Sequence, residues 1–195
     1  MNWHAFSVKN NEKESWAFER LSYLLFCAEF DNRIGLFRYK NQTGIETEPL
    51  KKDNQYYGFQ AKYYKTPISK NTHDIIDSIR KAKNTNPHLQ NIYLYLNQEL
   101  SESNDKKKKK PKYQLDVEES AKRLGVTIHW RVPSHFELQL SLPENQYLVD
   151  IFFNLEPNDS DFIFEINKHN DQILRAIQTE IPYRKEKIKI DRTTI

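Results

Sequence analysis

The sequence feature that most constrains the fold is the segment Tyr56–Tyr64, in which polar and apolar side chains alternate. Successive side chains of a β-strand point to opposite faces of a sheet. The segment therefore predicts a strand with Gln60 and Lys62 on one face and apolar residues on the other. A polar cluster at 51–54, of the kind that forms turns, separates it from a second extended segment at 44–50. Together the two segments predict a β-hairpin.

Helical and extended patterns follow one another along the rest of the chain. Apolar residues recur at helical spacing between 13 and 30, and Thr72 has the side chain of a helix N-cap. In chain order we expect helices over 13–30, 72–83 and 116–124, strands over 34–39, 92–96 and 126–132, and short helices over 135–140 and 144–153. This order predicts an α/β fold with a mixed β-sheet flanked by helices.

The length of 195 residues suits one domain with a sizeable core and a short appendage. Residues 156–160 have the composition of a linker, and apolar residues between 161 and 181 recur on one face of an expected helix. The chain stops at Ile195 without an evident domain end. We therefore expect one domain over 1–157 and, over 158–195, a helical linker with the start of a following module.

The composition narrows the class of protein. Aromatic residues make up 13% of the chain, with 11 Tyr and 11 Phe, so we expect a core built largely from rings. Cys27 is the only cysteine, which excludes a disulfide framework and a metal site with several cysteines. No apolar run approaches the ~18–20 residues that a membrane span needs, and the first residues do not have the pattern of a secretory signal. We therefore expect a soluble, cytoplasmic protein with no membrane partner.

The positive charge is local. The formal net charge is +3, but the excess of basic residues lies in 101–112 and 181–195, and the rest of the chain is acidic. Five consecutive lysines, Lys106–Lys110, lie in the first of these segments. Blocks of like charge repel one another, so we interpret this run as a solvated loop. The same charges could attract nucleic-acid phosphates without sequence preference.

The hairpin brings three polar side chains together. If the hairpin turns within residues 51–54, Glu46 falls opposite residues 59–61, on the strand that carries Gln60 and Lys62. Mg²⁺ takes hard oxygen ligands and keeps several waters, so one carboxylate with amide or carbonyl oxygens can hold it. Lys62 could orient or deprotonate a bound water, or stabilise developing negative charge. Glu48, which shares the strand face of Glu46, is the alternative carboxylate.

Glu46 followed by Gln60-x-Lys62 resembles the PD-(D/E)xK nuclease signature in its Gln-x-Lys form and is similar to Mrr-like restriction endonucleases. The resemblance covers roughly residues 10–132. It implies a restriction-endonuclease-like mixed β-sheet flanked by helices, followed here by a C-terminal helical connector. It also implies a Mg²⁺-dependent endonuclease for double-stranded DNA, with Mn²⁺ as a possible substitute. Glu46 and Gln60 would hold the metal, and Lys62 would act on the attacking water.

The same resemblance implies a further carboxylate. Family members have a helix before the hairpin that often contributes one, and Phe18-Glu19 resembles this element. Glu19 would then be a second metal ligand or a water-orienting group. The chain departs from the family pattern in two respects: the family usually has Asp at the position of Glu46, and the strict Pro-Asp dipeptide is absent. Asp53 is an unsuitable substitute because it falls in the predicted turn.

The layout of the whole chain resembles the N-terminal nuclease effectors of bacterial antiviral STAND ATPases. In those proteins a Mrr-like domain is followed by a helical connector into a nucleotide-binding module. Sensing of a phage protein drives oligomerisation there, which clusters the nucleases for DNA cleavage. The resemblance implies a homo-oligomer assembled through a larger C-terminal ATPase module. This sequence has no Gly-x-x-x-x-Gly-Lys-Ser/Thr phosphate loop, so the ATPase would lie outside it.

Other interpretations of these residues stay open. A sheet face with ordinary polar residues would leave a non-catalytic domain of the same fold that binds nucleic acid or a protein. An enzyme that cleaves RNA would use the same site, because both nucleic acids present the same phosphate chemistry. The tyrosines at 56, 57, 63 and 64 could stack on bases, but we favour packing within the hairpin. We interpret His129 as a packed histidine and Cys27 as a small buried hydrophobe.

Overall fold

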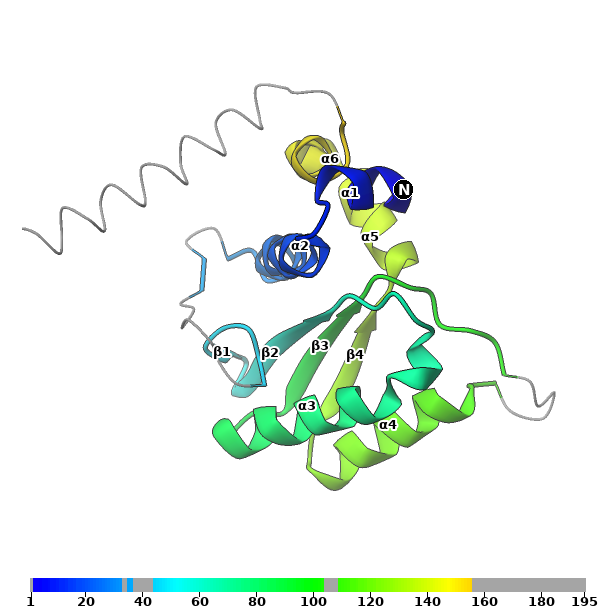
Figure 1. Cartoon of the computed structure of the whole chain (residues 1–195). Helices are drawn as coiled ribbons and strands as arrows, with labels where there is room; N and C mark the ends of the chain where they lie inside the picture. The colour runs from blue at the N-terminus through cyan, green and yellow to red at the C-terminus, as the bar shows by residue number, and fades with distance from the viewer. Residues whose placement is uncertain (1, 33–34, 37–43, 104–108, 156–195) are drawn as a thin grey trace, which may run out of the picture.

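The computed structural model describes residues 2–32, 35–36, 44–103 and 109–155. These residues form a mixed four-stranded sheet with helices on both faces (Figure 1). The strands lie in the order β1 (Leu50–Lys52), β2 (Gln55–Lys62), β3 (Asn91–Leu96) and β4 (Thr127–Arg131). The β1–β2 pair is antiparallel, and the β2–β3 and β3–β4 pairs are parallel. The predicted α/β class and the mixed sheet are confirmed.

The helices form two layers. Those of the described residues are α1 (Trp3–Lys9), α2 (Glu14–Glu29), α3 (Thr72–Thr85), α4 (Lys112–Arg123), α5 (Pro133–Leu140) and α6 (Gln146–Phe152), with short 3₁₀ turns η1 (Ile68–Lys70) and η2 (Pro143–Asn145). Figure 1 shows α2 against one face of the sheet, with α1, α5 and α6 beyond it, and α3 and α4 against the other face. The sheet is therefore covered on both sides, as parallel strands require.

The hairpin between β1 and β2 turns at Asp53 and Asn54, which both have positive φ, 48° and 60°. Asp and Asn tolerate this left-handed region better than most residues, and it suits a two-residue hairpin turn. The predicted hairpin is confirmed, but its first strand is shorter than the expected 44–50. Residues 44–48 are bent rather than a regular strand, and Pro49 has no N–H to donate to a sheet.

The face that α2 covers is packed with aromatic rings, and we call it the aromatic face. Phe59 of β2 contacts Phe26 of α2 at a ring-centroid distance of 5.2 Å, and Tyr95 of β3 stacks on Phe136 of α5 at 5.7 Å. Its buried cluster comprises Phe6, Ala17, Phe18, Leu21, Leu25, Phe26, Phe59, Tyr95, Phe136, Leu140, Leu148, Ile151, Phe152 and Phe153. The expectation of a core built from rings is confirmed for this face.

The opposite face, which we call the aliphatic face, packs against α3 and α4. Alternation along β3 sends Ile92, Leu94 and Leu96 to this side and Tyr93 and Tyr95 to the other. Its buried cluster comprises Ile45, Ile68, Ile75, Ile79, Ala82, Leu89, Ile92, Leu94, Leu96, Tyr113, Val117, Ala121, Val126 and Val132. The expectation of a ring-rich core is wrong for this face, because the two inward stripes of α3 and α4 are almost entirely aliphatic.

Helix boundaries agree with the sequence where capping residues are clear. Gly125, with φ of +69°, follows the end of α4 as predicted. The N-cap of α3 is Asn71 rather than the expected Thr72. Helix α1 was not predicted, because seven residues give too little periodicity; the Asn2 side chain caps it by accepting a hydrogen bond of 3.1 Å from Ala5 N. Most of the expected strand 34–39 and the whole connector 158–195 lie outside the described residues.

Candidate functional site

Strand β2 presents its polar side chains to the aliphatic face. Gly58, two residues before Gln60, lies under the side chains of Ile45 and Leu89, which belong to the aliphatic cluster. Lys62 contacts α3 on the same side of the sheet, whereas Phe59 packs in the aromatic cluster. The predicted alternation, with Gln60 and Lys62 on one face and apolar residues on the other, is confirmed.

The bent segment 44–48 runs beside β2. The backbone N–H of Glu46 donates to Phe59 O at 3.1 Å, which places Glu46 within the predicted range of opposite residues. The Gln60 Nε2 group donates to Gly44 O. Gly44 has a φ of +88°, and a Cβ there would overlap the backbone of α3. Because only glycine fits this close approach, Gly44 fixes how near the segment lies to α3 and Gln60.

Burial distinguishes the two candidate carboxylates of this segment. Ile45 and Thr47 are fully buried, Glu46 is half-buried and Glu48 is exposed. Ile45 belongs to the aliphatic cluster, so the alternation of burial turns Glu46 toward the outer side of the segment, at the edge of the sheet. Glu46 is also the candidate whose backbone is bonded to β2, and Glu48 is the more exposed of the two.

The Gln60 side chain is the most unusual polar group of β2. It is 1% exposed, and its Oε1 atom has no hydrogen-bond partner. Buried polar atoms in folded proteins are almost always paired, and an unpaired one needs an explanation. An amide oxygen is a neutral, hard ligand of the kind that Mg²⁺ or Ca²⁺ accepts. Gln60 Oε1 is therefore a candidate ligand atom, and its side chain is enclosed by its surroundings.

Lys62 is held by an acidic side chain on the first turn of α3. Its Nζ atom lies 3.0 Å from Asp74 Oδ2, and the Tyr64 hydroxyl donates to the same oxygen at 2.6 Å. The Lys62 side chain is 20% exposed, whereas that of Asp74 is 56% exposed. The ammonium group thus lies at the carboxyl end of β2, partly shielded and fixed by one carboxylate.

The protonation states of this group follow from its surroundings. Burial raises the pKa of Asp74, but hydrogen bonds from Tyr64 and Lys62 and the positive charge of Lys62 and Lys81 outweigh it and lower the pKa on balance. Burial and the bond to Asp74 raise the pKa of the Tyr64 phenol. Near neutral pH the cluster therefore contains a carboxylate that accepts two hydrogen bonds and a tyrosine that keeps its proton.

Sequence reasoning missed Asp74 and Tyr64. Asp74 has the pattern of an acidic residue in the first turn of a helix, where it stabilises the helix dipole. In the sequence, Tyr64 is one of four tyrosines in the segment of the predicted hairpin. Tyr57 and Tyr63 pack as expected of structural rings, but their ring partners lie outside the predicted hairpin, in α1, in β3 and in and just after α2. Only the approach of α3 to the end of β2 shows that Asp74 and Tyr64 meet at Lys62.

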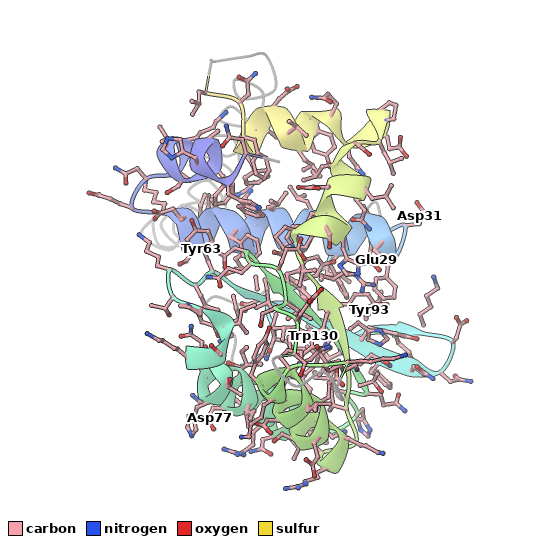
Figure 2. All side chains as sticks on the ribbon, turned by 90° about the vertical axis from the view of Figure 1, so that its right-hand side faces the viewer. Glu29, Asp31, Tyr63, Asp77, Tyr93 and Trp130 are labelled. Carbon is pink, nitrogen blue, oxygen red and sulfur yellow. The ribbon has the colours of Figure 1, made fainter. Side chains whose placement is uncertain are left out.

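Glu19 lies in the other layer of the fold. Phe18, its neighbour on α2, contacts Tyr63 at a ring distance of 5.9 Å, so this part of α2 lies near the end of β2 that carries Lys62 (Figure 2). Glu19 itself is half-buried. It shares a stripe of α2 with Tyr23, whose hydroxyl bonds the backbone of Leu36. The structure therefore brings Glu19 to the same end of the sheet as Lys62 but places α2 on the opposite face.

A second polar cluster lies on the aromatic face. Glu29, at the end of α2, accepts hydrogen bonds from Arg131 of β4, one of them at 3.0 Å, and from the Tyr95 hydroxyl at 3.3 Å. The Arg131 guanidinium also lies 4.5 Å from the centre of the Tyr93 ring (Figure 2). Because these charges are paired with each other, we interpret the cluster as a clamp between α2 and β4.

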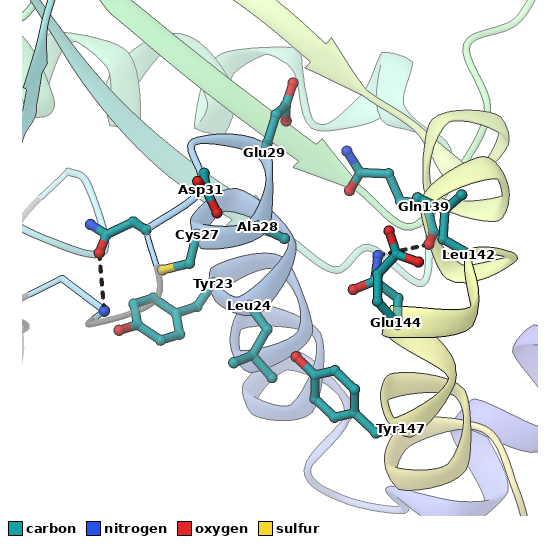
Figure 3. A pocket seen from close by; sticks show the side chains of 13 residues that line it. Tyr23, Leu24, Cys27, Ala28, Glu29, Asp31, Gln139, Leu142, Glu144 and Tyr147 are labelled. Atoms are coloured by element: carbon teal, nitrogen blue, oxygen red, sulfur yellow. Dashed lines mark hydrogen bonds between the residues drawn. The ribbon is translucent and has the colours of Figure 1, made fainter.

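A cleft of about 690 Å³ opens beside this clamp, between the last turns of α2 and the α5–α6 region (Figure 3). Its lining mixes acidic, amide and apolar side chains: Tyr23, Leu24, Cys27, Ala28, Glu29, Asp31, Asn32, Gly35, Gln139, Leu142, Glu144, Asn145 and Tyr147. Cys27 is 7% exposed, as predicted for a small buried hydrophobe. The cleft is separated from Gln60 and Lys62 by the sheet, so it is not part of the candidate site.

If a cation binds at Gln60, its ligands would be oxygen atoms. Within the described residues, no group of three or more His, Cys, Asp or Glu side chains is arranged to hold a metal ion. A metal at Gln60 would therefore use the amide oxygen, the carboxylate of Glu46 and water or backbone carbonyls. This donor set suits Mg²⁺, which keeps several waters, better than Zn²⁺, which prefers nitrogen and sulfur.

Comparison with known proteins does not identify a family for this chain. No protein-family model matches the chain, and no curated protein matches it significantly. The described helices include none that is both long and apolar enough to cross a lipid bilayer. The resemblance to PD-(D/E)xK nucleases thus depends on the residues of β2 and the element order around them.

Proposed function

We propose that this chain is a metal-dependent DNA endonuclease domain with a restriction-endonuclease-like fold. The observation that carries the proposal is the buried Gln60 oxygen without a partner, two residues from a lysine that is fixed in place. A buried polar atom that stays unpaired costs roughly 1–3 kcal/mol. Trp3 Nε1 and Ser22 Oγ are unpaired as well, but of these three atoms only Gln60 Oε1 shares a strand with a lysine that is paired with a carboxylate. In PD-(D/E)xK nucleases, which this chain resembles, a Gln-x-Lys pair on a strand of the sheet can be the metal-binding and catalytic element.

Each residue has a distinct role in this proposal. Gln60 and Glu46 hold Mg²⁺. Glu19, which the family resemblance implied as a further carboxylate, has no direct role in this arrangement, because α2 packs on the opposite face of the sheet. When bound, the ion stabilises negative charge on the oxygens of a phosphodiester and lowers the pKa of a bound water. Lys62, whose ammonium is a hydrogen-bond donor, holds a phosphate oxygen and stabilises the charge that develops there. Gln60 is neutral where many nucleases have a second carboxylate, so we expect weak metal binding.

The proposal extends to the way the domain works. One domain presents one candidate site, so cutting both strands of a duplex requires at least two copies. We propose that the domain is the effector of a larger bacterial anti-phage defence protein, and that a C-terminal ATPase module brings the copies together. The described residues form no long recognition helix outside the two packed layers, which supports cleavage with low sequence specificity.

The alternative is a non-catalytic domain of the same fold that binds nucleic acid or a protein. Two observations favour it. Within the described residues no three acidic or histidine ligands converge, and the Lys62 ammonium already has a carboxylate partner. In this alternative, Lys62 and Asp74 form an ordinary ion pair between strand and helix.

Cleavage of supercoiled plasmid by the purified chain tests the proposal. We expect nicking with Mg²⁺ or Mn²⁺ that EDTA abolishes, and a loss of at least about 10²-fold in Lys62→Ala, because the charge-stabilising donor is gone. Lys65→Ala is the matched control, since Lys65 is 76% exposed and pairs with Glu14 instead. The assay is run over a concentration series and with an artificially dimerised chain, because assembly is expected to raise the rate.

Metal binding is measured separately by calorimetry. Gln60→Met and Glu46→Gln are expected to weaken Mg²⁺ binding, whereas Glu48→Gln, two residues from Glu46 and exposed, leaves it unchanged. No cleavage in any format, together with no Mg²⁺ binding, would establish the non-catalytic alternative. Cleavage of RNA but not of DNA would keep the site and change the substrate.

A further inference from the structure

We propose that Asp74 and Tyr64 are positioning residues that fix the Lys62 ammonium for its encounter with a substrate phosphate; this inference rests on the proposed nuclease function. Neither residue belongs to the Gln-x-Lys motif, and they come from different elements. Asp74 is the third residue of α3, and Tyr64 follows the end of β2. Their side chains meet at one atom, Asp74 Oδ2, which also accepts from Lys62.

Asp74, the partner of Lys62, and Tyr64, which donates to Asp74, are themselves anchored. The backbone N–H of Tyr64 donates to Asn97 Oδ1 at 2.8 Å, and Tyr64 O accepts from Asn97 Nδ2 at 3.0 Å and from Gln98 Nε2 at 2.7 Å. Asp74 lies in the first turn of α3, where the helix dipole stabilises a carboxylate. The two anchors fix Asp74 Oδ2 relative to the end of β2, so the position of Lys62 Nζ is fixed as well.

The Lys62 side chain is more shielded from solvent than that of its neighbour Lys65. The Lys62 side chain is 20% exposed, whereas that of Lys65 is 76% exposed. A lysine side chain has four flexible bonds and adopts many rotamers unless a partner selects one. The Asp74 carboxylate provides that selection at Lys62, and the Tyr64 phenol holds the carboxylate in place.

The arrangement leaves the ammonium able to bind an anion. An ammonium has three N–H donors, and Asp74 uses one of them. Tyr64 donates to the same carboxylate oxygen, which divides the negative charge of Asp74 between two donors. Two N–H groups of Lys62 remain for the oxygens of a phosphodiester. A shift of about 1 Å in such a group can cost on the order of 10²-fold in rate.

A merely structural ion pair would have different consequences. It would contribute to stability, and its loss would change the folded fraction but not the rate of the folded enzyme. A positioning role predicts the opposite: the Asp74 side chain is 56% exposed, so its replacement leaves the fold intact and lowers the rate of cleavage.

The test compares Asp74→Asn, Asp74→Glu and Tyr64→Phe in the plasmid assay at saturating enzyme. Asp77→Asn is the matched control, one turn further along α3, because Asp77 pairs with Arg80 and His73 instead of Lys62. We expect Asp74→Asn to lower the cleavage rate constant by about 10²-fold with unchanged DNA affinity and Mg²⁺ binding. Asp74→Glu restores part of the rate, Tyr64→Phe causes a smaller loss, and Asp77→Asn cleaves as the wild type does.

NMR of the Lys62 ¹⁵Nζ group gives a readout that is independent of cleavage. In the wild type we expect a resolved ammonium signal protected from exchange, and in Asp74→Asn its loss. Wild-type cleavage by Asp74→Asn, with Lys62→Ala inactive, would overturn the positioning role and leave the nuclease proposal standing. A wild-type chain that binds Mg²⁺ but never cleaves DNA would overturn both proposals.

Discussion

The two faces of the sheet are built differently. The aromatic face is a continuous set of rings from α1, α2, α5 and α6, and its main polar groups, Glu29 and Arg131, are bonded to each other. The aliphatic face is packed by branched side chains from α3 and α4, and it includes a paired polar cluster in which Glu118 accepts from Gln114 Nε2 at 3.0 Å and from Trp130 Nε1 at 2.9 Å.

On the aliphatic face, Gln60 Oε1 is buried without a partner. Unpaired buried polar atoms occur in both layers, because Trp3 Nε1 of α1 and Ser22 Oγ of α2 are also without a partner. Of these three atoms, only Gln60 Oε1 lies on a strand with a lysine that is paired with a carboxylate.

This difference shows where function is expected. A paired clamp such as Glu29–Arg131 satisfies both charges and has little left to offer a ligand. An unpaired buried oxygen is tolerated only where something else compensates for it. Strand β2 contains both situations in adjacent residues, Phe59 for the aromatic face and Gln60 for the aliphatic face. Replacing each in turn separates stability from function.

The largest effect is expected at Phe59. The side chain is fully buried among the rings of the aromatic face, so Phe59→Ala leaves a cavity and loses ring contacts. We expect the free energy of unfolding to fall by about 3–5 kcal/mol, measured by urea denaturation. Gln60→Met conserves volume and removes the unpaired oxygen but also loses the bond from Gln60 Nε2 to Gly44 O, so it should lower the free energy of unfolding by only about 0.5–1.5 kcal/mol. Equal losses at both positions would contradict the functional difference between the faces.

A smaller effect is expected at Gly44, where the aliphatic face meets the bent segment. Gly44→Ala must adopt a φ of +88° and place a Cβ against the backbone of α3. Backbone strain of about 1 kcal/mol and overpacking of about 1–3 kcal/mol add to a loss of roughly 2–4 kcal/mol. Gly125→Ala is the matched control: its φ is +69°, but nothing lies within 4 Å of the new Cβ, so only the strain remains. Equal losses at the two glycines in urea denaturation would show that the segment moves away from α3 at no cost.

Much of the fold could be predicted from the sequence, because local patterns decide it. Period-two alternation in β2 assigned Gln60 and Lys62 to one face, and the polar turn located the hairpin. Helices α2, α3 and α4 followed from apolar spacing and from Gly125. The bent segment 44–48 could not be predicted, because its shape depends on the contact of Gly44 with α3, a residue pair far apart in the chain.

The site was predictable only in part. The turn position predicted that Glu46 lies opposite residues 59–61, and its backbone bond to Phe59 falls in this range, although Glu46 belongs to the bent segment and not to the regular β1–β2 pairing. The partner of Lys62 was hidden, because Asp74 lies 12 residues away on a helix whose packing angle no local pattern specifies. For the same reason, the burial of Gln60 was not foreseen: a glutamine on a predicted strand face is usually solvent-exposed, and here α3 and the bent segment cover it.

The smallest predicted effect is a pH dependence on the aromatic face. His129 of β4 stacks on Tyr93 at 4.7 Å, and its Nε2 lies 3.0 Å from Asn91 Oδ1, as expected of a packed histidine. Burial and the nearby Arg131 charge lower the pKa of His129 below 6.5, and Glu29 opposes them only in part.

The folded state therefore favours neutral His129, and the unfolded chain takes up the proton first. The resulting stability is fully present above pH 6.5 and is lost as the pH falls through the lower pKa of the folded state. Urea denaturation between pH 7.5 and 5 should show the stability advantage of the wild type over His129→Gln shrinking as the pH falls. On the aliphatic face, the pKa of the Asp74 carboxyl lies below its ordinary value of 3.8, so Asp74 takes up a proton only at a lower pH than His129 does. Acidification should thus weaken the aromatic face first, and an advantage that stays constant over this range would show that His129 carries no such linkage.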